Sequence, residues 1–198
     1  MILLIATTST DKLREIRPLV AGLPVELRTL ADVGPLPQPD ETAATFWENA
    51  REKAFAYAKA TGLTVVAEDS GLEIAGLDGE PGVQSARFLG TNVPYRERFA
   101  EIYRRLDRLP SAARQARFVT ALAAVSGGRV LFETEAWIDG EIAPAPAGEH
   151  GFGYDPIFLY APLGKTTAEL TLDEKSAVSH RARAFRDFAR WLRHAELS

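Results

Sequence analysis

Short apolar runs alternate with longer amphipathic stretches along the 198-residue chain. Residues 2–6, ILLIA, form a continuous apolar run of strand length. A polar segment follows, and Leu13, Ile16 and Val20 then repeat at the spacing of one helical face. This order of strand, polar turn and helix predicts an α/β protein in which helices cover a sheet.

Residues 42–77 predict a second helix and further strands. The alanine-rich stretch 42–61 carries one apolar stripe and is followed by Gly62, a common helix stop. The run LTVVA at 63–67 is predicted as a buried strand, EDSG at 68–71 as its turn and LEIAGL at 72–77 as another strand. The proline-rich segment 31–41 and the stretch 76–94 are predicted as loops.

The second half of the chain predicts an antiparallel part of the sheet between two helices. Residues 95–109 carry an apolar face, and Pro110 ends that helix. The pairs at 127–128 (Gly-Gly) and 139–140 (Asp-Gly) are hairpin-turn signals between strand-like stretches. Strands and helices in this order predict a mixed sheet flanked by helices.

The last helix is predicted to begin at a capping box, TLDE at residues 171–174. Its apolar stripe runs from Val178 to Leu192, and Lys175 and His180 lie off that stripe. Those two side chains are therefore candidates for a function rather than for the core.

The composition allows one compact α/β domain over residues 1–198, or two small lobes that share a core, because 46% of the residues are apolar. The chain has no cysteine, which excludes disulfides, a thiolate nucleophile and cysteine zinc sites and favours a cytoplasmic location. No apolar run approaches the ~20 residues that span a bilayer. The net charge of −4 argues against binding of long nucleic acid, whereas a small anionic ligand is allowed.

Two adjacent carboxylates, Glu68 and Asp69, follow the β-branched pair Val65 and Val66. Like charges side by side raise each other's pKa or recruit a cation, so this stretch is either a surface turn or a metal site.

The segment from Thr7 to Lys12 lies at the expected start of the first helix. Free N–H groups, hydroxyls and Lys12 would together hold a phosphate there. Ordinary capping by Ser9, Thr10 or Asp11 explains the same residues about equally well. The chain has no G-x-x-x-x-G-K-S/T segment, so this is not a P-loop.

Taken singly, each polar cluster of the chain has an ordinary structural explanation, but in combination they supply the parts that cleave a nucleoside triphosphate. Glu41 and Asp69 offer oxygen ligands to Mg²⁺, and a carboxylate beside the ion can deprotonate water. Lys12 and Lys53 can hold phosphates. An aromatic residue such as Phe152 can stack on a base.

His180 and Arg181 complete this set of candidate functional residues. Their donors can hydrogen-bond the edge of a base and reject a base that leaves them unsatisfied.

Six segments of the chain occur in the order and spacing of one known family. They are ATTSTDKLREI, ETAATFWENAREKA, AEDSGLEI, PGVQSARF, GFGYDPIF and AELTLDEKSAVSHRARA. With them the chain resembles the inosine triphosphate pyrophosphatase family, also called the Ham1-like family, from about Leu3 to about Arg190.

The resemblance implies an elongated α/β fold of two lobes, with a long mixed central sheet, a cleft between the lobes and usually a homodimer. It also implies Mg²⁺-dependent hydrolysis of noncanonical purine nucleoside triphosphates, namely dITP, ITP and XTP or dXTP, to the monophosphate and pyrophosphate. Such a reaction would cleanse the nucleotide pool.

The same resemblance implies roles for individual residues. Glu41 and Asp69 are implied as magnesium ligands and Asp69 as the residue that activates water, with Asp40 as a weaker metal candidate and Glu68 in support. The implied substrate contacts are Thr7, Thr8, Ser9, Thr10, Asp11, Lys12, Lys53, Ser70, Phe152, Gly153, Tyr154, Asp155, Lys175, His180 and Arg181.

Two positions depart from the family pattern. Ser9 stands where the family usually has Asn, so it keeps a donor and an acceptor on a shorter arm but loses the amide. Ala43 stands where the pattern has Gly, which matters only if that backbone needs a positive φ.

Two other functions stay open from the sequence. One is a pyrophosphatase for modified pyrimidine or general dNTPs. The other is a regulatory module that binds a nucleotide without cleaving it, although a module of that kind has no need of paired metal carboxylates.

Overall fold

A computed structural model describes residues 1–195 of the chain. In chain order its strands and helices are β1 (Ile2–Ile5), α1 (Thr10–Val20), β2 (Glu26–Thr29), α2 (Leu30–Val33), α3 (Phe46–Thr61), β3 (Thr64–Ile74), α4 (Tyr95–Leu106), β4 (Gln115–Ser126), β5 (Arg129–Ile142), β6 (Phe158–Tyr160), β7 (Lys165–Thr166), α5 (Leu172–Val178) and α6 (His180–His194).

The strands form one seven-stranded sheet in the order β2-β1-β3-β4-β5-β6-β7. Strand β1 pairs in parallel with both β2 and β3, whereas β6 pairs antiparallel with both β5 and β7. Parallel neighbours need crossover connections, which α1 and α3 supply. The predicted mixed sheet flanked by helices is confirmed.

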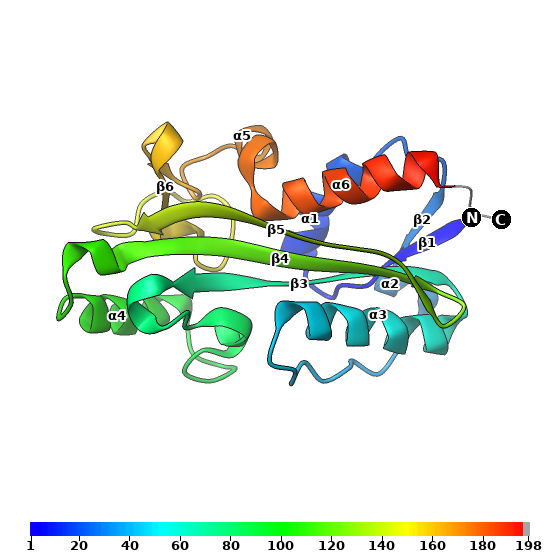
Figure 1. Ribbon diagram of the computed structural model, residues 1–198, viewed down its shortest axis with the longest axis horizontal. Coiled ribbons are helices and arrows are strands. Elements are labelled where there is room, and N and C mark those ends of the chain that lie inside the picture. The colour runs from blue at the N-terminus through cyan, green and yellow to red at the C-terminus, as the bar shows by residue number, and fades with distance from the viewer. Residues whose placement is uncertain (196–198) are drawn as a thin grey trace. The chain divides into compact units, whose positions relative to one another are not determined.

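The chain divides into two compact units. The first contains residues 1–69, 120–136 and the part from 181 onward, and the second contains residues 70–119 and 137–180. Neither unit is a single stretch of sequence, because the long strands β3, β4 and β5 each contribute to both (Figure 1).

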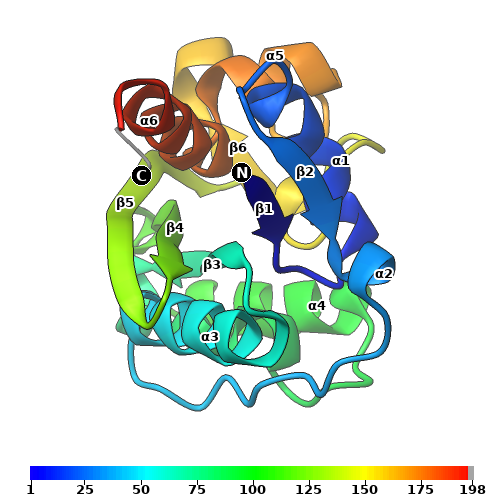
Figure 2. The same cartoon turned by 90° about the vertical axis from the view of Figure 1, so that its right-hand side faces the viewer.

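Helices cover both faces of the strands in the first unit. Figure 2 shows α3 on one side and α1 with α6 on the other. On the α1 and α6 side, Ile16 of α1, Val66 of β3 and Phe185 of α6 belong to one buried apolar cluster. The helices therefore hold the end of β1 and the middle of β3 between them.

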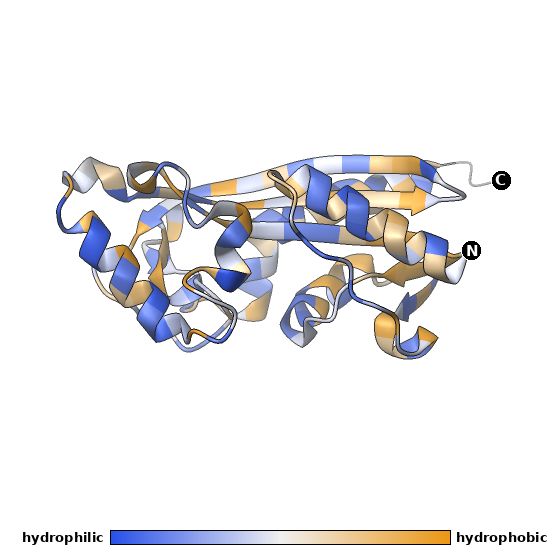
Figure 3. Ribbon diagram, turned by 90° about the horizontal axis from the view of Figure 1, so that it is seen from below, coloured by the Kyte–Doolittle hydropathy of each residue, from blue (hydrophilic) through white to orange (hydrophobic). Residues whose placement is uncertain are grey.

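The second unit has its own core. Phe99 and Ile102 of α4 pack in one buried cluster with Leu72 of β3, Ile138 of β5 and Phe158 of β6. Most other residues of α4 are hydrophilic (Figure 3), as expected for a helix that buries one stripe. None of the helices in residues 1–195 is long and apolar enough to cross a membrane.

The predicted turn at residues 68–71 is wrong, because β3 runs without interruption from Thr64 to Ile74. Successive side chains of a strand point to opposite faces of the sheet. Glu68 and Asp69 can therefore both be buried in the middle of a strand without lying against each other.

The hairpin turn at Gly127 and Gly128 is confirmed, whereas the turn predicted at Asp139 and Gly140 is wrong. Gly140 lies inside β5, where a Cβ atom would come within 2.5 Å of the Leu159 carbonyl oxygen. This glycine therefore serves close approach of β6 rather than a change of chain direction.

The capping box at Thr171 and Glu174 is confirmed, but the helix that it begins ends at Val178. Ser179 has extended backbone dihedrals, so α6 starts as a separate helix at His180. The one-turn helix α2 occupies the start of the proline-rich segment, which was predicted as a loop.

Candidate active site

Strand β3 delivers Glu68 and Asp69 to two different surroundings in the first unit. Glu68, which is 2% exposed, contacts residues from α1 and α6. Asp69, which is 6% exposed, contacts α3 through Asn49. The strand thus separates two carboxylates that would repel each other on one face.

Glu68 belongs to a buried chain of ion pairs. Its carboxylate lies 2.5 Å from Lys12 Nζ and 3.6 Å from an Arg181 nitrogen, and Arg181 also donates to Glu15 at 2.5 Å. Burial alone would raise the pKa of Glu68, but Lys12 and Arg181 hold it well below its usual range. Glu68 is therefore ionised and joins the starts of α1 and α6 to β3.

Asp69 titrates in the opposite direction. Burial raises the pKa of Asp69, and the nearby Lys53 and Lys12 only partly oppose that effect. Asn49 Nδ2 donates to Asp69 Oδ2 at 2.9 Å. A carboxylate whose pKa lies above the ordinary value is a stronger base than a surface aspartate.

Lys53 of α3 links the segment before that helix to the same part of β3. Its ammonium forms an ion pair with Glu41 and donates to the Glu68 carbonyl oxygen at 3.1 Å. Burial would lower the pKa of Lys53, but Glu41 and Asp69 raise it above its ordinary value. Lys53 is therefore a permanent cation beside both predicted metal ligands.

The first loop begins α1 with an ordinary cap. Ser9 is the N-cap, its hydroxyl accepts from the Lys12 N–H at 3.2 Å, and Thr7 Oγ1 accepts from the Ser9 N–H at 3.2 Å. Thr8 and Thr10 are exposed. In this loop Lys12 is the residue that reaches the buried carboxylates.

Two other acidic residues lie apart from this cluster. Asp11 forms an exposed ion pair with Arg14 at 3.2 Å, and Asp40 is exposed on the segment before α3. Neither position resembles the buried surroundings of Asp69.

The carboxylates of the cluster outnumber its cations by one. The carboxylates are Glu15, Glu41, Glu68 and Asp69, and the cations are Lys12, Lys53 and Arg181. Among residues 1–195 no group of three or more His, Asp or Glu side chains could by itself hold a metal ion. Two carboxylates and an excess of negative charge nevertheless fit Mg²⁺, which proteins commonly bind through one or two carboxylates together with substrate phosphates.

The second unit contains another buried group, centred on Asp155. Its Oδ2 accepts from the Phe152 N–H at 2.7 Å and from Lys175 Nζ, and its Oδ1 accepts from Thr167 Oγ1 at 2.7 Å. A Cβ atom on residue 151, where Gly151 has φ +71°, would lie 2.0 Å from Asp155 Oδ2. Asp155 therefore fixes the shape of the 151–155 loop.

Other residues that were predicted to contact the substrate have different environments. Lys175 lies 5.2 Å from the Phe152 ring centre, and the His180 ring stacks on Phe118 at 4.9 Å and 16°. Tyr154 is buried and donates to the Ser85 carbonyl oxygen at 2.9 Å.

Three of the predicted residues are less enclosed than these. Ser70, Phe152 and Gly153 are each half-buried, unlike Tyr154. The half-buried residues have surface left to offer a ligand, whereas Tyr154 serves the packing of the second unit.

Two residues for which no role was predicted from the sequence belong to the first group. Glu15 is 5% exposed and pairs with Arg181, and Asn49 is 1% exposed and bonds Asp69. Glu15 lies three positions after Lys12, on the same helical face beside buried Ile16. A charged residue at a core-facing position is the sequence signal that could have identified it.

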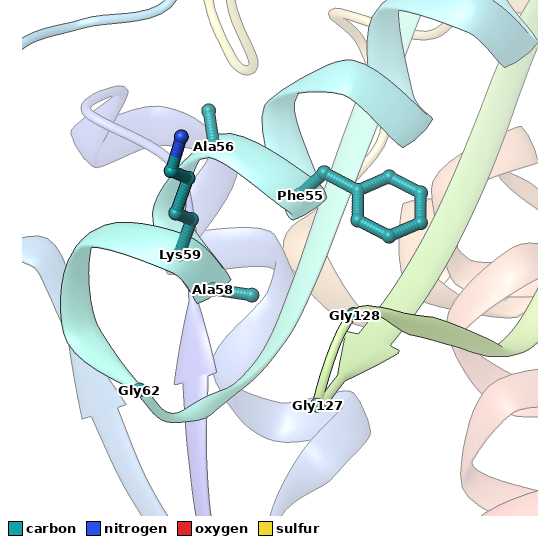
Figure 4. Close-up of a pocket in the computed structure, with 7 residues that line it drawn as sticks. All are labelled: Phe55, Ala56, Ala58, Lys59, Gly62, Gly127 and Gly128. Carbon is teal, nitrogen blue, oxygen red and sulfur yellow. The ribbon is translucent and has the colours of Figure 1, made fainter.

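A separate pocket of about 450 Å³ lies at the C-terminal end of α3 and the β4–β5 turn (Figure 4). Its lining includes Phe55, Lys59 and Gly128. None of its lining residues belongs to the charged cluster, which contacts the first half of α3.

Comparison with known proteins places this arrangement in a family. The model of the Ham1 family matches residues 3–191, nearly the whole chain. The chain belongs to the Ham1 family. Its sequence is 45% identical to a dITP/XTP pyrophosphatase of Syntrophobacter fumaroxidans, over 96% of this chain and 81% of that protein.

Two further Ham1-family comparisons agree with this assignment. A dITP/XTP pyrophosphatase of Geobacillus kaustophilus is 45% identical, over 92% of this chain and 89% of that protein. The solved structure of a HAM1 protein from Coxiella burnetii matches with a TM-score of 0.91 and 35% identity, over 98% of this chain and all of that one. The α/β Ham1 fold therefore extends over almost the entire sequence.

One departure from the family pattern has no backbone consequence. The non-glycine residues with positive φ in the described chain are Asp78 and Leu89. Ala43 therefore replaces the usual Gly without strain.

Proposed function

We propose that this Ham1-family chain is a nucleoside triphosphate pyrophosphatase that hydrolyses dITP, ITP and XTP or dXTP to the monophosphate and pyrophosphate. The observation that carries the proposal is the buried cluster of the first unit. It joins Lys12, Glu41, Lys53 and Asp69, residues from three separate segments that the sequence had proposed for phosphate, metal and water. Curated relatives with dITP/XTP pyrophosphatase activity in their names support the choice of substrate.

In the proposed reaction Asp69 takes a proton from a water molecule while the water oxygen bonds to the α-phosphorus. The bond from the α-phosphorus to the bridging oxygen of the β-phosphate breaks, and that oxygen leaves with pyrophosphate. Lys12 and Lys53 offset the charge that develops on the departing group. Catalysis of this kind depends on positioning and electrostatic stabilisation.

Glu41 and Asp69 are the residues that we propose to hold Mg²⁺. The ion would supply positive charge to the triphosphate when it is bound. The fit rests on oxygen donors and on the excess carboxylate of the cluster.

We also propose which residues recognise the base. Phe152 is proposed to stack on the base, and Lys175, His180 and Arg181 are proposed to discriminate its edge through hydrogen bonds. A 6-keto purine offers an acceptor to these donors, whereas the amine of adenine does not. The ion pair of Lys175 with Asp155 and the stacking of His180 on Phe118 support fixed orientations of these donors.

One assay tests the proposed function. Purified protein is incubated with Mg²⁺ and, in separate reactions, with dITP, XTP, dGTP, dATP and dUTP, while monophosphate, pyrophosphate and orthophosphate are measured separately. Preference for dITP and XTP with release of pyrophosphate is the expected result. Equal cleavage of all substrates, release of orthophosphate, or binding without turnover would each overturn it.

We also propose that the protein is a homodimer and works in the cytoplasm, as the resemblance and the lack of cysteine suggest. Light scattering coupled to size-exclusion chromatography tests the first point. A mass equal to the 21.6 kDa of a single chain would contradict it.

A further inference from the structure

Asn49 is a buried amide that uses both of its ends. The residue lies in the first turn of α3 and is 1% exposed. Its Nδ2 donates to Asp69 Oδ2 at 2.9 Å, and its Oδ1 accepts from the Ala43 N–H at 3.0 Å. A single side chain therefore connects the strand that carries Asp69 to the segment that carries Glu41.

The orientation of this amide is fixed by its partners. A backbone N–H can only donate, so the atom that faces Ala43 must be the amide oxygen. The amide nitrogen then faces Asp69 and requires an acceptor there. Asn49 thereby holds the Oδ2 oxygen of Asp69 in place.

Lys53 repeats the same connection one helical turn later. Residues 49 and 53 lie on one face of α3, four positions apart. Lys53 pairs with Glu41 and donates to the Glu68 carbonyl oxygen, as Asn49 bonds Ala43 and Asp69. Residues 34–45 contain no strand or α-helix, so these bonds from α3 hold the segment.

We propose that Asn49 is a positioning residue, which orients the carboxylate of Asp69 and keeps the Glu41 segment beside it. The inference rests on the proposed function for its kinetic consequence, while its structural consequence is independent of any activity. Residues that orient metal ligands through a second hydrogen bond typically affect metal affinity or activity by 10- to 100-fold, and Asn49 occupies such a position.

The test uses two variants of the full chain that separate the two ends of the amide. Asn49→Ala removes both hydrogen bonds. Asn49→Asp is nearly isosteric and keeps an acceptor for the Ala43 N–H, but it replaces the donor to Asp69 by an oxygen. With dITP and Mg²⁺ we expect kcat to fall about 10- to 100-fold in both variants, with KM changed much less.

Crystal structures give a readout that needs neither metal nor turnover. In Asn49→Ala we expect residues 41–45 to move away from α3 and Asp69 to rotate, whereas in Asn49→Asp residues 41–45 stay in place. Unchanged positions of both in Asn49→Ala would overturn the proposal. If Asn49→Ala does not fold, the kinetics and structure of Asn49→Asp decide, and a normal kcat in that variant overturns it.

Ala54→Gly is the matched control. Ala54 is fully buried in the same helix and makes no contact with Asp69 through a polar group. Glycine there lowers stability through backbone entropy, and kcat should stay near that of the parent chain. An equal loss of kcat in Ala54→Gly would show that Asn49 acts only through stability. If the parent chain cleaves neither dITP nor XTP, the proposed function fails, while the crystal structures still test Asn49.

Discussion

Glu68 and Asp69 are neighbours in the sequence, yet their pKa values move in opposite directions. Glu68 is surrounded by Lys12 and Arg181, which favour its charged form. Burial raises the pKa of Asp69 more than the nearby cations lower it, which favours its neutral form. Environment therefore gives two carboxylates of one strand different roles, the first in structure and the second as the candidate base.

Replacing Asp69 by Asn should remove most turnover of dITP and leave the fold intact. Asparagine has nearly the same shape, but it cannot take a proton from water or offer a charged oxygen to Mg²⁺. A loss of general-base function typically costs 10²- to 10⁴-fold, which steady-state kinetics would detect. Asp187→Asn, at a partly exposed residue that pairs with Arg190, is the control and should keep the parent rate. Near-normal rates in Asp69→Asn would refute the assignment.

Replacing Glu68 by Gln should change how stability depends on pH. Because the pKa of Glu68 is lowered on folding, its contribution is present above its ordinary value of 4.5 and is lost as pH falls below that value. The parent chain should therefore lose unfolding free energy more steeply below about pH 4.5 than the variant. Urea unfolding at a series of pH values measures both slopes, and parallel slopes would contradict the prediction.

The same substitution should lower stability at neutral pH. It leaves Lys12 and Arg181 without their shared buried partner, a change that typically costs about 3–5 kcal/mol. The change in the urea midpoint at pH 7, multiplied by the slope of unfolding free energy against urea, gives this value.

At this scale the sequence could predict which residue types meet, but not on which face each lies. Lys12, Glu41, Lys53 and Asp69 were proposed from the chemistry of their charged groups and from the family resemblance. Glu15 and Asn49 were given no role, because their importance follows from burial, which depends on how α1 and α3 pack on the sheet.

Among the secondary-structure elements, β5 shows how glycine can mislead a prediction from sequence. Asp139 and Gly140 have the composition of a tight turn, but the glycine is required by the close approach of β6. The Gly-Gly pair at Gly127 and Gly128 is a turn signal of the same kind and does form a turn. Local propensity cannot distinguish the two, because the deciding contact comes from residues 158 and 159, far along the chain.

Gly140→Ala should therefore destabilise the protein. A Cβ atom there would lie 2.5 Å from the Leu159 carbonyl oxygen and 2.7 Å from the Phe158 ring, and neither group can move without disturbing a strand. Overpacking of this kind costs about 1–3 kcal/mol, which thermal or urea unfolding would reveal.

The neighbouring substitution Asp139→Ala is the matched control. Its side chain is 69% exposed, so the change should stay within about 0.5 kcal/mol of the parent. Equal stability of the two variants would contradict the contact seen at Gly140.

Helices with strong local signals were predicted well. The α3 stripe ending at Gly62 and the capping box of α5 both match the structure, because caps and stops are encoded within a few residues. The break at Ser179 was not predicted, since no glycine or proline marks it.

At the scale of the whole molecule, three strands contribute residues to both compact units. Each unit is assembled from separate stretches of sequence, and β3, β4 and β5 belong to both. A hydrogen-bonded ladder that continues through both units couples their unfolding. The two units should therefore unfold together rather than as independent domains.

The three tryptophans allow this to be measured. Trp47 and Trp191 lie in the first unit and Trp137 lies in the second. Variants that keep only Trp191 or only Trp137, with Phe at the other positions, should show coincident urea midpoints by fluorescence and by circular dichroism. Two separated midpoints within one variant would show that the units unfold independently.

Side chains alternate between the two faces of the sheet along the uninterrupted strand β3, so the number of residues before Glu68 decides which face each acidic side chain occupies. Removing one residue between Thr64 and Glu68 would exchange the sides from which the two acidic groups emerge, while removing two would restore them. Asp69 would then meet the cations of α1 and α6, and Glu68 would meet α3. Length changes in this strand can therefore preserve its chemistry only in steps of two.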